Sequence, residues 1–156
     1  MNIGELIVEK RLVNVDNLNG RVYRIGDSRY CVKIRKGLNN FKEYNDRKLK
    51  HEFDVAEELY HAGVSVPKPE GVIGIRDPET SNFYPGFVME YVNGIDLHKI
   101  SDKSLFKIIF RLKDKEMELV KLLGFIPDDG YYLSNSIWCP EGKKVYLIDF
   151  EHWKRK

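Results

Sequence analysis

The chain has 156 residues, enough for one domain or two small lobes with an apolar core. Its 26 basic residues nearly balance its 24 acidic ones, and a net charge of +2 is too small a bias to indicate nucleic-acid binding. No apolar run approaches the roughly 18 residues of a membrane span, and the N-terminus lacks a signal-peptide pattern. Cys31 and Cys139 lack metal-site spacing, so we expect buried thiols in a reducing, cytoplasmic setting without zinc.

The N-terminal part of the chain predicts three strands. β-Branched and aromatic residues between turn signals place them at residues 12–15, 21–25 and 29–34. Alternation along the third strand puts Cys31 and Lys33 on the face opposite Tyr30, Val32 and Ile34. The simplest interpretation of a strand lysine such as Lys33 is a solubilising residue on an edge strand.

A helix is predicted over residues 46–61, after a polar connector at 37–45 and before Gly63. Its apolar residues form one stripe at helical spacing: Leu49, Phe53, Ala56, Leu59 and Tyr60. Glu52 projects within that stripe, and a buried carboxylate is costly unless a cation pairs with it. Lys33 is the obvious partner, because the helix must pack on the sheet that carries it. The alternative is a glutamate at the stripe's edge that reaches water.

The middle of the chain predicts extended structure and then a lobe boundary. Prolines keep residues 64–69 extended, and a hairpin follows over 71–75 and 83–91. Asn93-Gly94 is typical of a turn or hinge. We therefore predict two lobes, residues 1–92 and 93–156, of which the first is a sheet with one helix.

The second lobe begins with a helix. Ser101 or Asp102 caps it, it runs over residues 103–123, and Gly124 ends it. We expect a core helix whose buried stripe comprises Leu105, Ile108, Ile109, Leu112, Leu119 and Leu123, with lysine and acidic residues on the other face. The basic end of the sequence, 152–156, is expected to be solvated.

A β-hairpin is predicted over residues 137–139 and 145–148, joined by the turn Pro140-Glu141-Gly142. The residue that enters the first strand of a hairpin lies beside the residue that leaves the second, so Asn135 and Asp149 meet at one end. Amide and carboxylate oxygens suit Mg²⁺, which completes its shell with waters and substrate phosphates. The alternative is a pair of polar residues that cap a turn.

Five segments, in order, resemble the protein-kinase-like superfamily, in the branch of Rio kinases, aminoglycoside phosphotransferases and other small kinases. Val32-Lys33-Ile34 is similar to the strand whose lysine holds the nucleotide phosphates, and Glu52 to the helix glutamate paired with it. Residues 87–94 resemble the hinge in which backbone groups of Glu90 and Val92 bind adenine. Asn135 and Asp149-Phe150-Glu151 resemble the catalytic-loop asparagine and the metal-binding motif after it.

The resemblance implies an α+β, bilobal kinase-like fold with an antiparallel N-lobe sheet and one helix, and a reduced C-lobe of a helix plus a β-hairpin. It implies an enzyme that uses ATP and Mg²⁺ to phosphorylate a hydroxyl of a protein (serine or threonine) or of a small molecule. Lys33 would orient the phosphates, and Asn135 and Asp149 would hold the metal. The alternative is a pseudokinase, a nucleotide-binding or interaction module without efficient catalysis.

Three departures from the family pattern bear on this resemblance. Counting back from Asn135 puts Gly130 at the position of the catalytic aspartate, whereas counting forward from Gly124 puts Asp129 there; we predict Asp129, with Asp128 behind it. Gly20 is the only glycine of the loop that would cover the phosphates. The sequence stops soon after Glu151, before the family's later helices, so we expect either that a second copy or a partner chain completes the C-lobe or that substrate binds to a reduced lobe of one helix and one hairpin.

Overall fold

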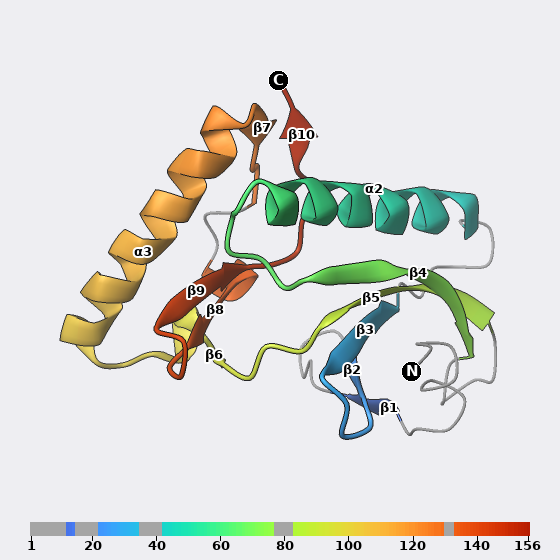
Figure 1. Cartoon of the computed structure of the whole chain (residues 1–156), viewed down its shortest axis with the longest axis horizontal. Helices are drawn as coiled ribbons and strands as arrows, with labels where there is room; N and C mark the ends of the chain where they lie inside the picture. The colour runs from blue at the N-terminus through green and yellow to red at the C-terminus, as the bar shows by residue number, and fades with distance from the viewer. Residues whose placement is uncertain (1–11, 15–21, 35–41, 77–82, 130–132) are drawn as a thin grey trace. The chain divides into compact units, whose positions relative to one another are not determined.

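A computed structural model of the chain describes residues 12–14, 22–34, 42–76, 83–129 and 133–156 (Figure 1). The chain divides into two compact units. The first unit comprises residues 1–53 and 69–91, and the second unit comprises residues 54–68 and 92–156. The division therefore falls within helix α2 (Lys42–His61), between Phe53 and Asp54.

The described part of the first unit contains a five-stranded antiparallel sheet in the order β1-β2-β3-β5-β4 (Figure 1). Its strands are β1 (Leu12–Asn14), β2 (Val22–Ile25), β3 (Tyr30–Ile34), β4 (Pro69–Arg76) and β5 (Phe83–Glu90). These are the predicted strands within a residue or two at each end. One face packs around Tyr23, Ile25, Val32, Ile34 and Val88, which are all buried. The alternation predicted along β3 is thus confirmed for Val32 and Ile34.

Helix α2 begins at Lys42, four residues before its predicted start. The polar residues there were interpreted as a connector, but lysine and glutamate are good helix formers, so polarity alone does not indicate a loop. Leu49, Ala56 and Leu59 are buried as predicted. Tyr60 is 38% exposed, so its assignment to the buried stripe was wrong.

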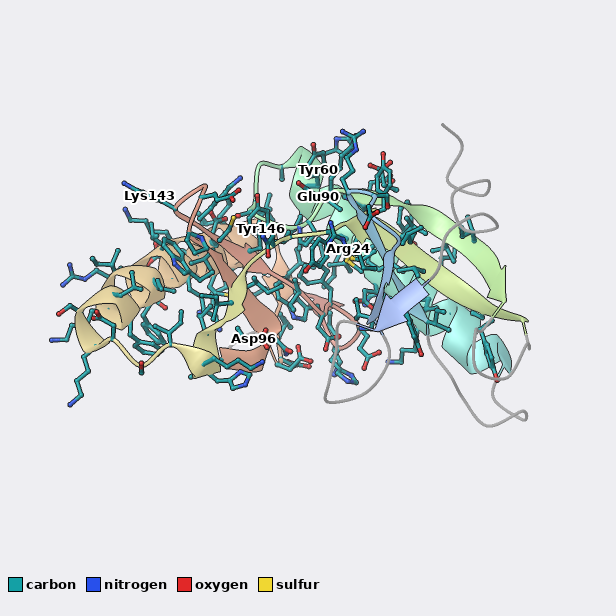
Figure 2. The ribbon with its side chains drawn as sticks, turned by 90° about the horizontal axis from the view of Figure 1, so that it is seen from below. Arg24, Tyr60, Glu90, Asp96, Lys143 and Tyr146 are labelled. Carbon is teal, nitrogen blue, oxygen red and sulfur yellow. The ribbon has the colours of Figure 1, made fainter. Side chains whose placement is uncertain are left out.

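In the second unit, β6 (Ile95–Asp96), β8 (Ser136–Cys139) and β9 (Lys144–Leu147) form a three-stranded antiparallel sheet. The predicted hairpin is confirmed as β8 and β9, and Figure 2 labels Lys143 in its turn and Tyr146 on β9. A short 3₁₀ helix, η2 (Leu97–Lys99), follows β6. The part of the chain after residue 92 therefore begins with a strand, where we expected a helix.

Helix α3 (Lys103–Leu122) has the predicted N-cap, because the side chain of Asp102 accepts a hydrogen bond from the backbone N–H of Leu105 at 3.0 Å. Gly124 follows it with a φ of +91°, a backbone conformation that favours glycine. The buried face comprises Ile109, Lys113, Met117 and Val120. Ile108 is 55% exposed, which corrects the predicted stripe, and Lys113 is buried although we expected lysines on the solvent face.

The C-terminal segment is tied into the second unit. Strand β10 (Lys154–Arg155) pairs with β7 (Phe125–Ile126), and Figure 1 shows the two side by side beyond the end of α3. Trp153 is only 1% exposed, and the Arg155 guanidinium lies 4.5 Å from the centre of the Phe125 ring. The expectation of a solvated tail was wrong for Trp153, because it rested on charge and ignored the tryptophan, whereas His152 and residues 154–156 are exposed as expected.

The two cysteines differ in burial. Both cysteines are free, and Cys31 is buried, whereas Cys139 is half-buried. None of the helices in the described ranges has the length and apolar character that crossing a membrane requires.

Candidate functional site

Lys33 lies on β3, inside the sheet of the first unit. Its cross-strand neighbours are Val22 on β2 and Phe87 on β5, so it is not on an edge strand. Its Nζ lies 3.1 Å from Oε1 and 3.0 Å from Oε2 of Glu52 on α2, and the two side chains are 8% and 2% exposed. The expected pairing is confirmed, and the two alternatives, a solubilising lysine and a solvated glutamate, are excluded. Such a buried pair gives a lysine with a fixed position and direction.

Glu90, which was predicted to bind the cofactor, is the last residue of β5. The Cys31 thiol donates to the Glu90 carbonyl oxygen at 3.7 Å, and the backbone N–H of Tyr91 donates to the Arg29 carbonyl at 2.8 Å. Arg24 stacks over the Tyr91 ring, 4.6 Å from its centre; Figure 2 labels Arg24 and Glu90. Burial, and then the charge of Glu90, raises the pKa of the Cys31 thiol to about 12, so this sulfur stays protonated.

Val92 follows directly and is half-buried, and the division of the chain assigns it to the second unit. Gly20 lies outside the described residues, so its predicted place over the phosphates stays a prediction. The same holds for Gly130, one of the two positions considered for the catalytic aspartate.

Three predicted site residues come together in the second unit: Asp129, Asn135 and Asp149. The Asn135 side-chain Nδ2 donates to the Asp129 backbone carbonyl at 2.9 Å. The Asn135 backbone carbonyl accepts from the N–H of Ile148 at 3.1 Å, one residue before Asp149. Asn135, the last residue of the 3₁₀ helix η3 (Leu133–Asn135), therefore links Asp129 to the end of β9.

Asp149 has a backbone φ of +67°, in the left-handed region. Residues with a Cβ rarely adopt that conformation, aspartate and asparagine being the most tolerant of them. Such backbone positions are concentrated at functional sites, where the surrounding structure holds them in place. No pattern in the sequence indicated this conformation.

Asp129 is half-buried, and its Oδ1 accepts a hydrogen bond from the indole Nε1 of Trp153 at 3.1 Å. Burial is the largest cause that raises the pKa of its carboxyl, and the negative charge of Asp149 adds to it. His152 and the Trp153 hydrogen bond act in the opposite direction. Asp128, by contrast, is exposed and pairs with Lys154 at 3.3 Å. Trp153 is a site residue that the sequence analysis missed.

The donor set of the second unit fits a hard divalent cation. Asn135 uses its Nδ2 toward Asp129, which leaves the side-chain Oδ1 as the atom that could bind a metal. Asp149 contributes carboxylate oxygens. Oxygen-only donors of this kind suit Mg²⁺ rather than zinc, which prefers nitrogen and sulfur.

Comparison with known proteins supports the fold class. The chain superposes on the structure of the Cydia pomonella granulovirus kinase, PK-1, with a TM-score of 0.59 and 16% sequence identity. The match covers 98% of this chain and 55% of that one, so the chain spans about half the length of that kinase. No family model matches the sequence, and no curated protein matches it.

The chain thus has an α+β, protein-kinase-like fold. The predicted fold class is confirmed: an antiparallel five-stranded sheet with helix α2 is followed along the chain by helix α3 and the β8–β9 hairpin. Strand β6 is an addition that the sequence analysis did not foresee.

Proposed function

We propose that the protein is an ATP- and Mg²⁺-dependent phosphotransferase with a hydroxyl acceptor. The observation that carries this proposal is the buried ion pair between Lys33 and Glu52, formed between the inner strand and the helix of a kinase-like sheet. An isolated structural ion pair could occur in many folds. Here the second unit also assembles Asp129, Asn135 and Asp149, the residue types that phosphoryl transfer requires.

Each residue has a distinct part in the proposed reaction. Lys33 binds the α- and β-phosphates, and Glu52 keeps the lysine in place. The backbone groups of Glu90 and Val92 bind adenine, and Gly20 belongs to the loop over the phosphates. Asn135 and Asp149 hold Mg²⁺, which when bound neutralises charge on the β- and γ-phosphates.

Asp129 acts on the acceptor. Its carboxylate orients the hydroxyl and takes the hydroxyl proton, while the acceptor oxygen forms a bond to the γ-phosphorus and the bond from that phosphorus to the bridging oxygen breaks. The products are a phosphate ester and ADP. The raised pKa of Asp129 makes its carboxylate a better proton acceptor than an ordinary aspartate.

The acceptor is proposed as a serine or threonine of a protein or the hydroxyl of a small molecule. A relation to Rio kinases and aminoglycoside phosphotransferases is part of the proposal, and it rests on motif order alone. A second copy or a partner chain would supply further acceptor contacts. A nucleic acid is not proposed as a partner, because the net charge is only +2. A membrane is not proposed, because no apolar run in the sequence approaches the length of a span.

The test measures transfer of label from [γ-³²P]ATP to casein, to the chain itself and to water. Lys33→Met and Asp149→Asn should each lower the rate at least about a hundredfold, because each removes a charge that contacts phosphate or metal. Lys99→Met and Asp114→Asn, at exposed positions, are the matched controls. Transfer that survives both site changes would contradict the proposal.

A pseudokinase is the second candidate, and one observation favours it. The Asp129 carboxylate is already engaged by Trp153, and the neighbouring family position carries Gly130. Such a protein would bind ATP with Mg²⁺, seen as a rise in melting temperature that Lys33→Met abolishes, without turnover. Turnover above that of the Asp149→Asn variant would exclude it.

A further inference from the structure

Asp129 and Trp153 are brought together by the pairing of two short strands. Asp129 follows β7, Trp153 precedes β10, and in the pairing of these strands Lys154 lies opposite Ile126. Residues 24 positions apart in sequence therefore come within hydrogen-bond distance, with the Trp153 Nε1 3.1 Å from the Asp129 Oδ1. The contact is a consequence of the fold.

The indole is rigidly held. Trp153 is 1% exposed, its ring meets the edge of the Phe150 ring with centroids 4.8 Å apart and planes at 68°, and its backbone N–H donates to the Phe150 carbonyl at 3.1 Å. Phe150 directly follows Asp149 in the chain. The tryptophan therefore links the segment after Asp149 to the carboxylate of Asp129.

We propose that Trp153 is a positioning residue for phosphoryl transfer: its indole N–H holds Oδ1 of Asp129 and leaves Oδ2 for the substrate hydroxyl. This inference rests on the proposed function, in which Asp129 takes the hydroxyl proton. The proton passes to Oδ2 as the acceptor oxygen bonds to phosphorus and ADP departs, and the indole N–H stays intact throughout.

The chemistry of the indole suits this role. Asp149 repels the Asp129 carboxylate, so without a restraint Asp129 would turn away from it. A lysine or arginine could hold the carboxylate but would weaken it as a base by stabilising its charge. The indole N–H is a neutral donor that cannot accept a proton, so it fixes the orientation without competing for the proton that Asp129 must take.

The main test is Trp153→Phe, which removes the N–H and keeps an aromatic ring. We expect kcat to fall between about tenfold and a hundredfold, as for a misplaced catalytic group, with KM for ATP unchanged. The matched control is Trp138→Phe, which removes the other tryptophan from the same unit and should leave both constants within about twofold. Equal kcat in the two variants would overturn the inference while leaving the proposed function in place.

A second measurement needs no activity and no folded Trp153 variant. In a ¹H–¹⁵N spectrum of the wild-type chain, the Trp153 indole N–H should resonate downfield of the Trp138 indole N–H and move upfield in Asp129→Ala. An unchanged resonance would overturn the contact on which the inference depends. If the wild type transferred no phosphate but the resonance moved, the proposed function would fail and the hydrogen bond would stand.

Discussion

The side-chain amide of Asn135 donates to the backbone carbonyl of Asp129 across 2.9 Å. The bond occupies the Nδ2 of Asn135 and the backbone carbonyl of Asp129. The Oδ1 of Asn135 and the carboxylate of Asp129 take no part in it. Asn135 is only 9% exposed, so water does not easily replace a lost donor there.

Asn135→Asp should therefore destabilise the fold. The substitution keeps the shape of the side chain, removes the donor, and adds a negative charge beside a carbonyl oxygen and near Asp149. We expect a loss of about 1–3 kcal/mol in the free energy of unfolding, measured with urea. Asn93→Asp, at an exposed position, should change it by less than about 0.5 kcal/mol; similar losses in the two variants would contradict the prediction.

The ion pair of Lys33 and Glu52 predicts a strongly non-additive mutant cycle. Lys33→Met or Glu52→Gln alone removes one member of the ion pair and leaves the other charge buried, at a cost of about 3–5 kcal/mol each. The double variant buries no net charge, so it should be more stable than the sum of the two losses predicts. Additive losses, measured by urea denaturation, would show that the two groups do not depend on each other.

Gly94 predicts a steric effect next to β6. A Cβ at this position would overlap the side chain of Ile137 and the backbone carbonyl of Trp138 on β8, so Gly94→Ala must push two strands apart. We expect a loss of about 1–3 kcal/mol in the free energy of unfolding. Gly74→Ala, where a Cβ would meet nothing within 4 Å, is the control and should be close to neutral.

Asp129→Asn should raise the melting temperature at neutral pH. Because burial and Asp149 raise the pKa of Asp129 in the folded chain, ionisation of this carboxyl costs the folded state more than the unfolded state. That cost is complete above the raised pKa and is lost as the pH falls through it. The gap in melting temperature between the variant and the wild type should therefore shrink as the pH is lowered from 7 to about 4; a gap that widened would have the wrong sign.

Local patterns in the sequence predicted most of the fold. Alternation predicted β2 and β3, helical spacing with the Asp102 cap predicted α3, and turn residues predicted the β8–β9 hairpin. The pairing of Lys33 with Glu52 was predictable because an isolated carboxylate within an apolar stripe demands a cation. Each of these predictions depends on residues close in sequence or on the need to pair one buried charge.

The features that were missed depend on contacts between distant segments. Nothing local to the basic C-terminal residues indicates that β10 pairs with β7, and without that pairing Trp153 has no reason to be buried. The burial of Lys113 likewise depends on which side of α3 faces the core. The predicted stripe was broad enough to include the exposed Ile108, so it did not define that side. Helical spacing likewise included Tyr60 in the buried stripe of α2, although its side chain is exposed.

The backbone conformation of Asp149 restricts how this chain can change over time. A position with φ near +67° accepts glycine and asparagine at little cost and resists branched or bulky residues. A lineage that lost the carboxylate without losing the fold would therefore drift to one of those two residues. Among descendants of this chain, glycine or asparagine at position 149 would indicate a protein that had lost the Asp149 carboxylate and kept the fold.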